Sequence, residues 1–76
     1  MFELVDYLVG CFADKDSYEL VVVEDNDKVD IRVLVNKDSI TNVIGKGGKV
    51  AKAIRTIVKS AGQKLDKTYS VYVEER

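Results

Sequence analysis

Apolar side chains near the N-terminus recur at every third or fourth position. They follow the spacing i, i+3, i+4, i+7, which places them on one face of an amphipathic helix over residues 2–13. The polar run at residues 14–17 then interrupts this spacing. The sequence therefore predicts a first helix that is held in place by packing of one apolar face, made by Val5, Leu8, Val9 and Phe12.

The next segment changes from helical spacing to the spacing of strands. Residues 18–24 are rich in β-branched side chains and too few for a stable helix, so they predict a strand. Residues 25–27 favour a turn, in which Asn26 is best suited to a left-handed backbone angle. Apolar and polar positions then alternate over residues 29–36. The segment is therefore predicted to be a β-hairpin with one buried face.

The C-terminal half returns to helical spacing on both sides of a glycine-rich segment. A short helix is predicted just before residue 45, with Asp38 or Ser39 as its N-terminal cap. A longer helix is predicted over residues 49–61, and Gly62 is placed to end it in a left-handed cap. Residues 69–74 alternate and predict a last strand. The apolar face predicted for the longer helix consists of Val50, Ile54, Ile57, Val58 and Ala61.

The predicted element order is α-β-β-α-α-β, which belongs to the α+β class. A helical connection between the second and third strands favours parallel pairing, whereas the hairpin is antiparallel. We therefore expect one domain over residues 1–76, with a mixed three-stranded sheet and three helices packed on one face. The core of so short a chain is small, and a single cysteine cannot form an internal disulfide. Cys11 lies among apolar neighbours and is predicted to be a small buried hydrophobe.

The segment from Gly45 to Gly48 joins the two predicted helices. One glycine suffices to end a helix, so three glycines in four positions exceed what a turn needs. Glycine permits left-handed backbone angles and lets a ligand approach the main chain closely. Lys46 and Lys49 add positive charge, and the N–H groups that open the second helix point outward with the positive end of its dipole. These features favour a phosphate-bearing ligand over a plain turn.

The charged residues are distributed unevenly along the chain. The formal net charge of −1 argues, taken alone, against a nucleic-acid ligand. Residues 1–36 carry nine acidic and three basic side chains, however, whereas residues 37–76 carry nine basic and four acidic ones. The basic half contains the glycine segment. We expect Lys49 to bind the ligand and Lys59 to be solvated, while both interpretations stay open for Lys52 and Arg55.

The glycine segment and its surroundings resemble a known family. Ile44-Gly45-Lys46-Gly47-Gly48, placed between a short helix and a longer one, resembles the GXXG signature of KH domains, which bind single-stranded RNA or DNA. Gly47 departs mildly from the commonest pattern, in which a side chain occupies that position. The chain length, the N-terminal helix and the run from Val43 to Thr56 resemble more narrowly the KhpA family of small bacterial single-domain KH proteins. The resemblance covers nearly the whole chain and implies the type II KH arrangement.

The resemblance also implies where a ligand binds. In KH domains the bases lie in an apolar groove beside the loop, floored by residues of both central helices. The residues that match these positions are Ile40, Val43, Ile44, Val50 and Ile54. Of these, Val43, Ile44 and Val50 are expected to combine core packing with ligand contact. The predicted RNA-binding residues are therefore Gly45, Lys46, Gly47, Gly48, Lys49, Lys52, Arg55, Val43, Ile44 and Val50.

The resemblance further implies partners. The KhpA family is associated with self-association and with KhpB, a second KH-containing bacterial protein. A role as an RNA chaperone or regulator, acting as a homodimer or as a heterodimer with a KhpB-like protein, is therefore expected. Single-stranded DNA stays open as a ligand, because no residue is assigned to reading a 2′-hydroxyl group. The alternative is a protein-interaction module with little RNA affinity, for which Tyr72 is a candidate contact on the outer face of the last strand.

Other chemistries find no support in the sequence. A P-loop ending at Gly48-Lys49 requires glycine at position 43 and Ser or Thr at position 50, but both are valine. A dinucleotide fingerprint starting at Gly45 also requires glycine at position 50. No nucleophile–base pair is present, and the chain has no histidine, so we expect neither an enzyme nor a metal or other cofactor. No run approaches the roughly 18 apolar residues of a membrane span, so a cytoplasmic protein is expected.

Overall fold

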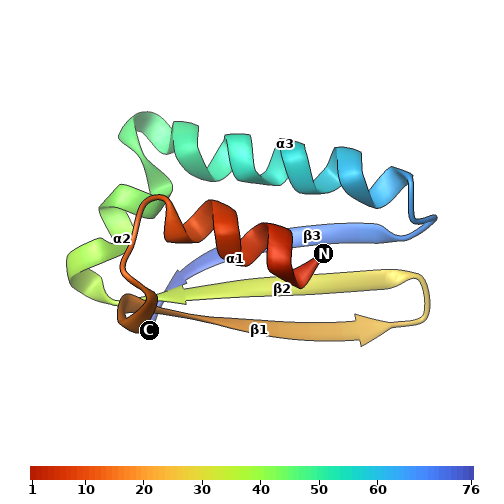
Figure 1. Ribbon diagram of the computed structural model, residues 1–76, viewed down its shortest axis with the longest axis horizontal. Coiled ribbons are helices and arrows are strands. Elements are labelled where there is room, and N and C mark those ends of the chain that lie inside the picture. Colours follow the sequence, from red (N-terminus) through yellow and green to blue (C-terminus); the bar gives the residue numbers. More distant parts are fainter.

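The computed structural model describes all residues from Met1 to Arg76. A three-stranded sheet forms one layer, and the helices cover one of its faces (Figure 1). The predicted α+β class and type II KH-like arrangement are confirmed. The elements in chain order are α1 (Phe2–Gly10), the 3₁₀ turn η1 (Lys15–Ser17), β1 (Tyr18–Asp25), β2 (Lys28–Val35), α2 (Lys37–Ile44), the 3₁₀ turn η2 (Lys46–Gly48), α3 (Lys49–Gln63) and β3 (Thr68–Glu75).

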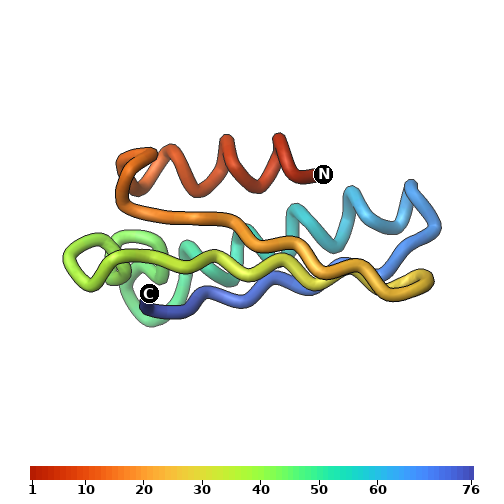
Figure 2. The backbone as a smooth tube through the Cα atoms, turned by 90° about the horizontal axis from the view of Figure 1, so that it is seen from below, coloured from red at the N-terminus to blue at the C-terminus, as the bar shows by residue number.

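Strand β2 lies at the centre of the sheet. It pairs antiparallel with β1 and parallel with β3, as predicted from the hairpin and from the helical connection to β3. The hairpin turn contains Asn26 in the predicted left-handed conformation, with φ 54°. Figure 2 shows the sheet from below, with α1 running alongside β1 and α3 crossing obliquely behind the strands. The two central helices therefore form the connection between the parallel strands.

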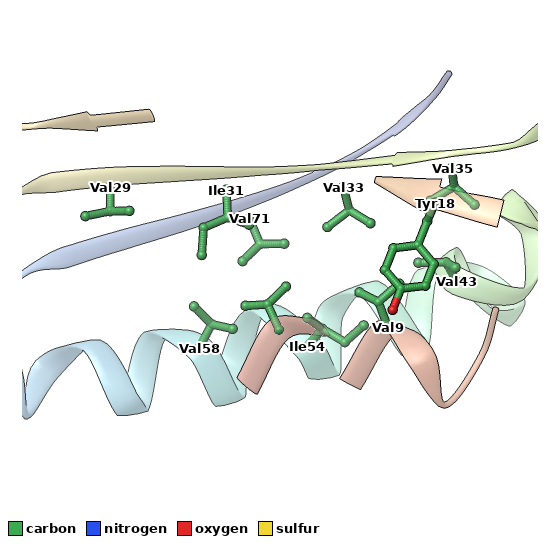
Figure 3. Packing of buried hydrophobic residues seen from close by; sticks show 11 residues of the cluster. Val9, Tyr18, Val29, Ile31, Val33, Val35, Val43, Ile54, Val58 and Val71 are labelled. Atoms are coloured by element: carbon green, nitrogen blue, oxygen red, sulfur yellow. The ribbon is translucent and has the colours of Figure 1, made fainter. Parts of the chain in front are cut away.

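The alternating face of β2 forms the centre of the core. Its four apolar side chains are at most 4% exposed, and they point toward α3 (Figure 3). Each of the other helices and strands adds at least one side chain to the same cluster. The core therefore joins every helix and strand to β2. Its members are Val5, Val9, Tyr18, Val29, Ile31, Val33, Val35, Val43, Ile54, Val58 and Val71.

The buried face of α3 differs from the predicted one. Ile57 is 43% exposed and lies off the core, whereas the small residues Ala51 and Gly62 are buried. Ala51, Ile54, Val58 and Gly62 follow one another at spacings of three or four, so they make one continuous stripe. The helix therefore approaches the sheet through a stripe with a small residue near each end.

Gly62 has a different role from the predicted one. It lies inside α3 and does not take a left-handed angle, so the predicted left-handed cap is wrong. A Cβ atom at this position would lie 2.4 Å from Cδ2 of Tyr69. Glycine is required here because the tyrosine ring of β3 packs directly on the helix. The left-handed residue of the following connector is Asp66, with φ 56°.

Three predictions near α1 and α2 are also wrong. The first helix ends at Gly10 and not at residue 13, and Cys11 in the following turn is exposed. Because Cys11 comes two positions after the buried Val9, it lies roughly 200° around the helix from the core. At the start of α2, the capping position belongs to Asn36, and no side chain makes a capping hydrogen bond.

A buried tyrosine fixes α1 to the sheet. Tyr18 of β1 is 8% exposed, and its hydroxyl donates to a carboxylate oxygen of Asp6 at 2.8 Å. Burial and the neighbouring carboxylate raise the pKa of Tyr18 to about 12, so the hydroxyl stays protonated and keeps donating at neutral pH. The position of α1 beside α3 therefore depends on a directed bond as well as on apolar packing.

The contact between Gly62 and Tyr69 generates a stability prediction. Gly62→Ala overpacks this contact and is expected to destabilise the fold by about 1–3 kcal/mol. Gly10→Ala is the matched control, because its Cβ would lie 3.4 Å from the Tyr18 hydroxyl, an ordinary contact distance. The control is expected to be neutral or to stabilise by up to about 1 kcal/mol. Urea denaturation of both variants measures the difference, and equal stabilities would contradict the assignment.

Candidate nucleic-acid interface

The loop between α2 and α3 has a backbone that glycine makes accessible. Gly45, Gly47 and Gly48 have φ values of 78°, 65° and 79°, which lie in the region that side chains disfavour. The N–H of Gly45 donates to the carbonyl oxygen of Thr41 at 2.8 Å and ends α2. The N–H of Gly48 donates to the carbonyl oxygen of Gly45 at 3.1 Å. The loop is therefore a closed, defined corner that directs the chain into α3.

The three glycines meet different surroundings. A Cβ at Gly45 would lie 2.4 Å from Cγ2 of Val50 and 2.8 Å from its backbone nitrogen, so there is no room for a side chain. At Gly47 and Gly48 no atom beyond the adjoining residues lies within 4 Å of the position a Cβ would take. Gly45 thus packs against the start of α3, while the main chain at Gly47 and Gly48 is open to a ligand.

The open main chain lies beside positive charge. Lys46 in the loop and Lys49 at the start of α3 are both exposed. The first turn of this 15-residue helix contains no acidic residue, and no side chain caps its N–H groups. The helix dipole and both ammonium groups therefore favour an anion at this corner.

Three further basic side chains continue from the loop along one flank of α3. Lys52, Arg55 and Lys59 are spaced i, i+3 and i+7, so they lie on one side of the helix. All three are exposed, and none takes part in an ion pair. The Nε of Arg55 donates to the carbonyl oxygen of Val71 at 3.1 Å, which shows that this flank faces β3. This flank of α3 is therefore a basic strip that faces the outer edge of β3.

The predicted apolar floor separates into surface and core residues. Val43 is fully buried and Ile54 is 2% exposed, so both belong to the core. Ile40, Ile44 and Val50 are half-buried and reach the surface. Of the predicted floor, these three are the ones that a ligand reaches without displacing the core.

Val50 lies on the opposite flank of α3 from the basic strip. There it lines a hollow of about 260 Å³ that runs between α1 and α3, here called the α1-side groove. The residues at this groove are Leu8, Phe12, Lys49, Val50, Ala53, Ile54 and Ile57. The structure therefore brings Lys52 and Arg55 together on one side of α3 and places Val50 on the other.

The sequence did not identify Tyr69 and Ser70 as neighbours of the basic strip. Both line a hollow between α3 and β3 together with Arg55 and Lys59. The helical spacing of the basic residues was visible in the sequence, but which flank of α3 would face β3 was not. Elsewhere, no helix is both long and apolar enough to cross a bilayer.

The unequal surroundings of the glycines predict unequal effects of alanine. Gly45→Ala displaces Val50 and strains the backbone. Gly47→Ala lowers the stability of the fold only by the cost of a left-handed angle at a residue with a side chain, about 1–2 kcal/mol. We expect Gly45→Ala to lower the free energy of unfolding by at least about 1 kcal/mol more than Gly47→Ala. Thermal or urea denaturation tests this order, and a Gly47→Ala variant that is the less stable of the two would contradict it.

Known proteins that are similar to this chain over most of its length all belong to one family. Residues 3–73 match the family described as KhpA/KhpB, KH domain. The protein named RNA-binding protein KhpA from Listeria monocytogenes is 34% identical, over 99% of this chain and 100% of its own. The protein of that name from Clostridium perfringens is 34% identical, over 96% of this chain and 99% of its own. The one from Bacillus subtilis is 36% identical, over 86% of this chain and 82% of its own. With its glycine corner and α-β-β-α-α-β order, this chain belongs to the KhpA/KhpB family of KH domains.

Proposed function

We propose that this protein binds single-stranded RNA at the loop from Gly45 to Gly48 and at the neighbouring Lys49, Lys52 and Arg55 of α3. The observation that carries the proposal is the main chain at Gly47 and Gly48, which has open space where side chains would be and lies beside Lys46 and Lys49. A sugar-phosphate backbone can approach such a surface closely. The relatives from three genera that bear the name RNA-binding protein KhpA support the same class of ligand.

The size of the loop determines the expected binding behaviour. A KH loop clamps about four nucleotides, so only a few phosphates are neutralised and the salt dependence of binding is shallow. A duplex holds its bases away from the surface beside the loop, so unpaired RNA is preferred. Single-stranded DNA stays open as a ligand, because the interface has no assigned contact to a 2′-hydroxyl group. We further propose, as the resemblance to the KhpA family implies, that the protein acts as a non-catalytic RNA chaperone or regulator in the bacterial cytoplasm.

A contact with about four nucleotides gives little affinity, so the working unit contains more than one domain. Linking two domains raises avidity through effective concentration without any new base contact. The chain therefore acts as a homodimer or together with a KhpB-like protein, which the family match supports.

The loop can be tested by reversing its charge. Replacing Lys46 and Gly47 with aspartate changes the local charge from +1 to −2 where the phosphate is expected. Repulsion should then weaken RNA binding by at least about tenfold, while the exposed position leaves the core intact. Fluorescence anisotropy with an unpaired RNA measures binding, and circular dichroism with a melting curve checks the fold.

Two single variants control this test. Lys46→Asp alone avoids the backbone strain at Gly47, whose φ is 65°. Lys64→Asp makes the same two-unit charge change as Lys46→Asp, but beyond the end of α3, and should bind RNA nearly as the unmodified protein does. Unchanged RNA affinity in a correctly folded double variant would show that the loop is only a turn.

A second candidate function, docking of another protein, is favoured by the α1-side groove. Phe12 and Ile57 are 42% and 43% exposed there, although both are large apolar side chains. Contiguous exposed apolar surface of this kind marks interaction sites more often than isolated side chains do. The proposed occupant is a second copy of this chain, which would cover both side chains and supply the second RNA-binding domain.

Self-association through this groove can be tested with one substitution on α3. Ile57→Lys introduces a charge into the groove and is expected to shift the protein to monomer in sedimentation-velocity runs. Thr56→Lys is the matched control, because it adds the same side chain one position away on an exposed part of the helix. If both variants sediment as the unmodified protein does, the groove is not the contact between copies.

A further inference from the structure

The edge of the sheet at β1 has no partner strand. Strand β1 pairs with β2 on one side only, in an unbroken register of eight residues. Figure 2 views the molecule from the side of β1 and shows no element crossing in front of this strand. Its backbone groups on this side are therefore free to pair with another strand. The edge lies across the sheet from β3 and has no role in the loop contact described above.

One hydrogen bond identifies the backbone groups of β1 that point outward. The N–H of Asn36 donates to the carbonyl oxygen of Ser17 at 2.7 Å. These two residues continue the register of β1 and β2 by one position. Hydrogen-bonded and non-bonded pairs alternate along an antiparallel ladder, so every second residue from Ser17 onward bonds to β2. The residues between them, whose N–H and C=O groups point away from β2, are Tyr18, Leu20, Val22 and Glu24.

The side chains along this edge are apolar in the middle and acidic toward both ends. Val22 and Val23 are 44% and 52% exposed. Edge strands commonly carry lysine, proline or a bulge that prevents pairing, and β1 has none of these. Residues 14–28 contain six acidic and two basic side chains. Of these carboxylates only Glu19 and Glu24 have ion-pair partners, so the two ends of the edge attract cations.

A hollow at the start of the edge has room for one long basic side chain. It has a volume of about 380 Å³ and lies between α1 and the beginning of β1. The carboxylates of Asp6 and Asp14 outnumber its one cation, Lys15, and the ring of Tyr7 is 71% exposed. Carboxylates and an aromatic face both favour a guanidinium or ammonium group. Tyr18 also lines the hollow, so a residue paired with it across the edge would direct its side chain to the same place.

The charges make a second copy of this chain a poor occupant of the edge. In the register that pairs Val22 with Val22, Glu19 of each copy would lie opposite Asp25 of the other. Like charges directly opposite each other destabilise a pair of strands. A segment with basic ends and an apolar middle has the complementary pattern.

We propose that the free edge of β1 binds an extended basic segment of another protein by strand addition. The segment pairs with the outward backbone groups and places apolar side chains beside Leu20 and Val22. Its Arg or Lys side chain enters the hollow at Tyr18. Main-chain hydrogen bonds supply the affinity, and the hollow selects the basic side chain. Because this edge is separate from the glycine loop, the inference does not depend on RNA binding.

A synthetic peptide tests the edge directly. The probe is Arg-Thr-Val-Thr-Val-Thr-Lys with blocked ends, which presents a basic side chain at each end in either strand direction. Its counterpart has glutamate at both ends. In isothermal titration calorimetry the basic peptide should bind at least about tenfold more tightly, since attraction at both ends replaces repulsion. Hydrogen exchange should slow on binding at the outward amides of Leu20 and Val22.

Substitutions separate strand addition from attraction by charge alone. Val22→Pro removes an outward N–H without removing a bond to β2, so the fold should survive and peptide binding should fall at least about tenfold. Val22→Thr keeps the N–H and the branched side chain and should bind as the unmodified protein does. Asp14→Asn should weaken binding by about threefold or more. Asp66→Asn makes the same charge change in the exposed connector after α3 and should have no effect.

The outcomes decide the proposal independently of the RNA-binding loop. If both peptides bind equally or not at all, or if Val22→Pro binds the basic peptide normally, strand addition is refuted. If Val22→Pro instead turns a dimer into a monomer in sedimentation and leaves peptide binding unchanged, the edge pairs two copies and the proposal is wrong. Should Val22→Pro fail to fold, Asp14→Asn and the exchange pattern still decide, because Asp14 is exposed and its side chain makes no capping bond. RNA affinity should be unchanged in every folded variant.

Discussion

The structure depends on the burial of one face of β2. The chain has neither a disulfide nor a cluster of metal-ligating side chains, so apolar packing must stabilise it. Four alternating side chains of β2 are almost fully buried, and burying a Val or Ile side chain contributes about 1.5–3 kcal/mol. All three helices must lie over this face to exclude water from it. Helix α3 does so through a stripe that begins at Ala51 and ends at Gly62, and this stripe sets how the helix is rotated about its axis.

The rotation of α3 divides its surface into two flanks with different chemistry. The flank toward β3 carries unpaired cations, including Arg55, and the flank toward α1 carries exposed apolar side chains such as Ile57. The glycine corner stands at the start of the helix, where the two flanks meet. An RNA strand along the basic flank and a second copy of the chain on the apolar flank would therefore overlap only at the start of α3, where Lys49 lines the α1-side groove. The two proposed activities are compatible for this geometric reason.

Local pattern was sufficient to predict the element order, the mixed sheet and the glycine corner. Each of these follows from spacing along the chain, and three left-handed glycines leave few alternatives for the corner. The errors concern side-chain environment. Periodicity favoured the large Ile57 over the small Gly62 as a core position, because the sequence did not reveal that Tyr69 packs against the helix. The hollow between α3 and β3 was missed for the same reason, since Lys59 and Tyr69 become neighbours only when β3 returns beside α3.

The central claim is that a single strand of RNA lies over the glycine corner and the β3 flank of α3. Amide chemical shifts of the ¹⁵N-labelled protein, followed by NMR during titration with an unpaired RNA hexamer, test it most directly. The account predicts the largest changes at Gly45, Gly47 and Gly48, with further changes at Ser70 on β3 and little change along α1. Changes confined to α1, or to the helix-free face of the sheet, would contradict it.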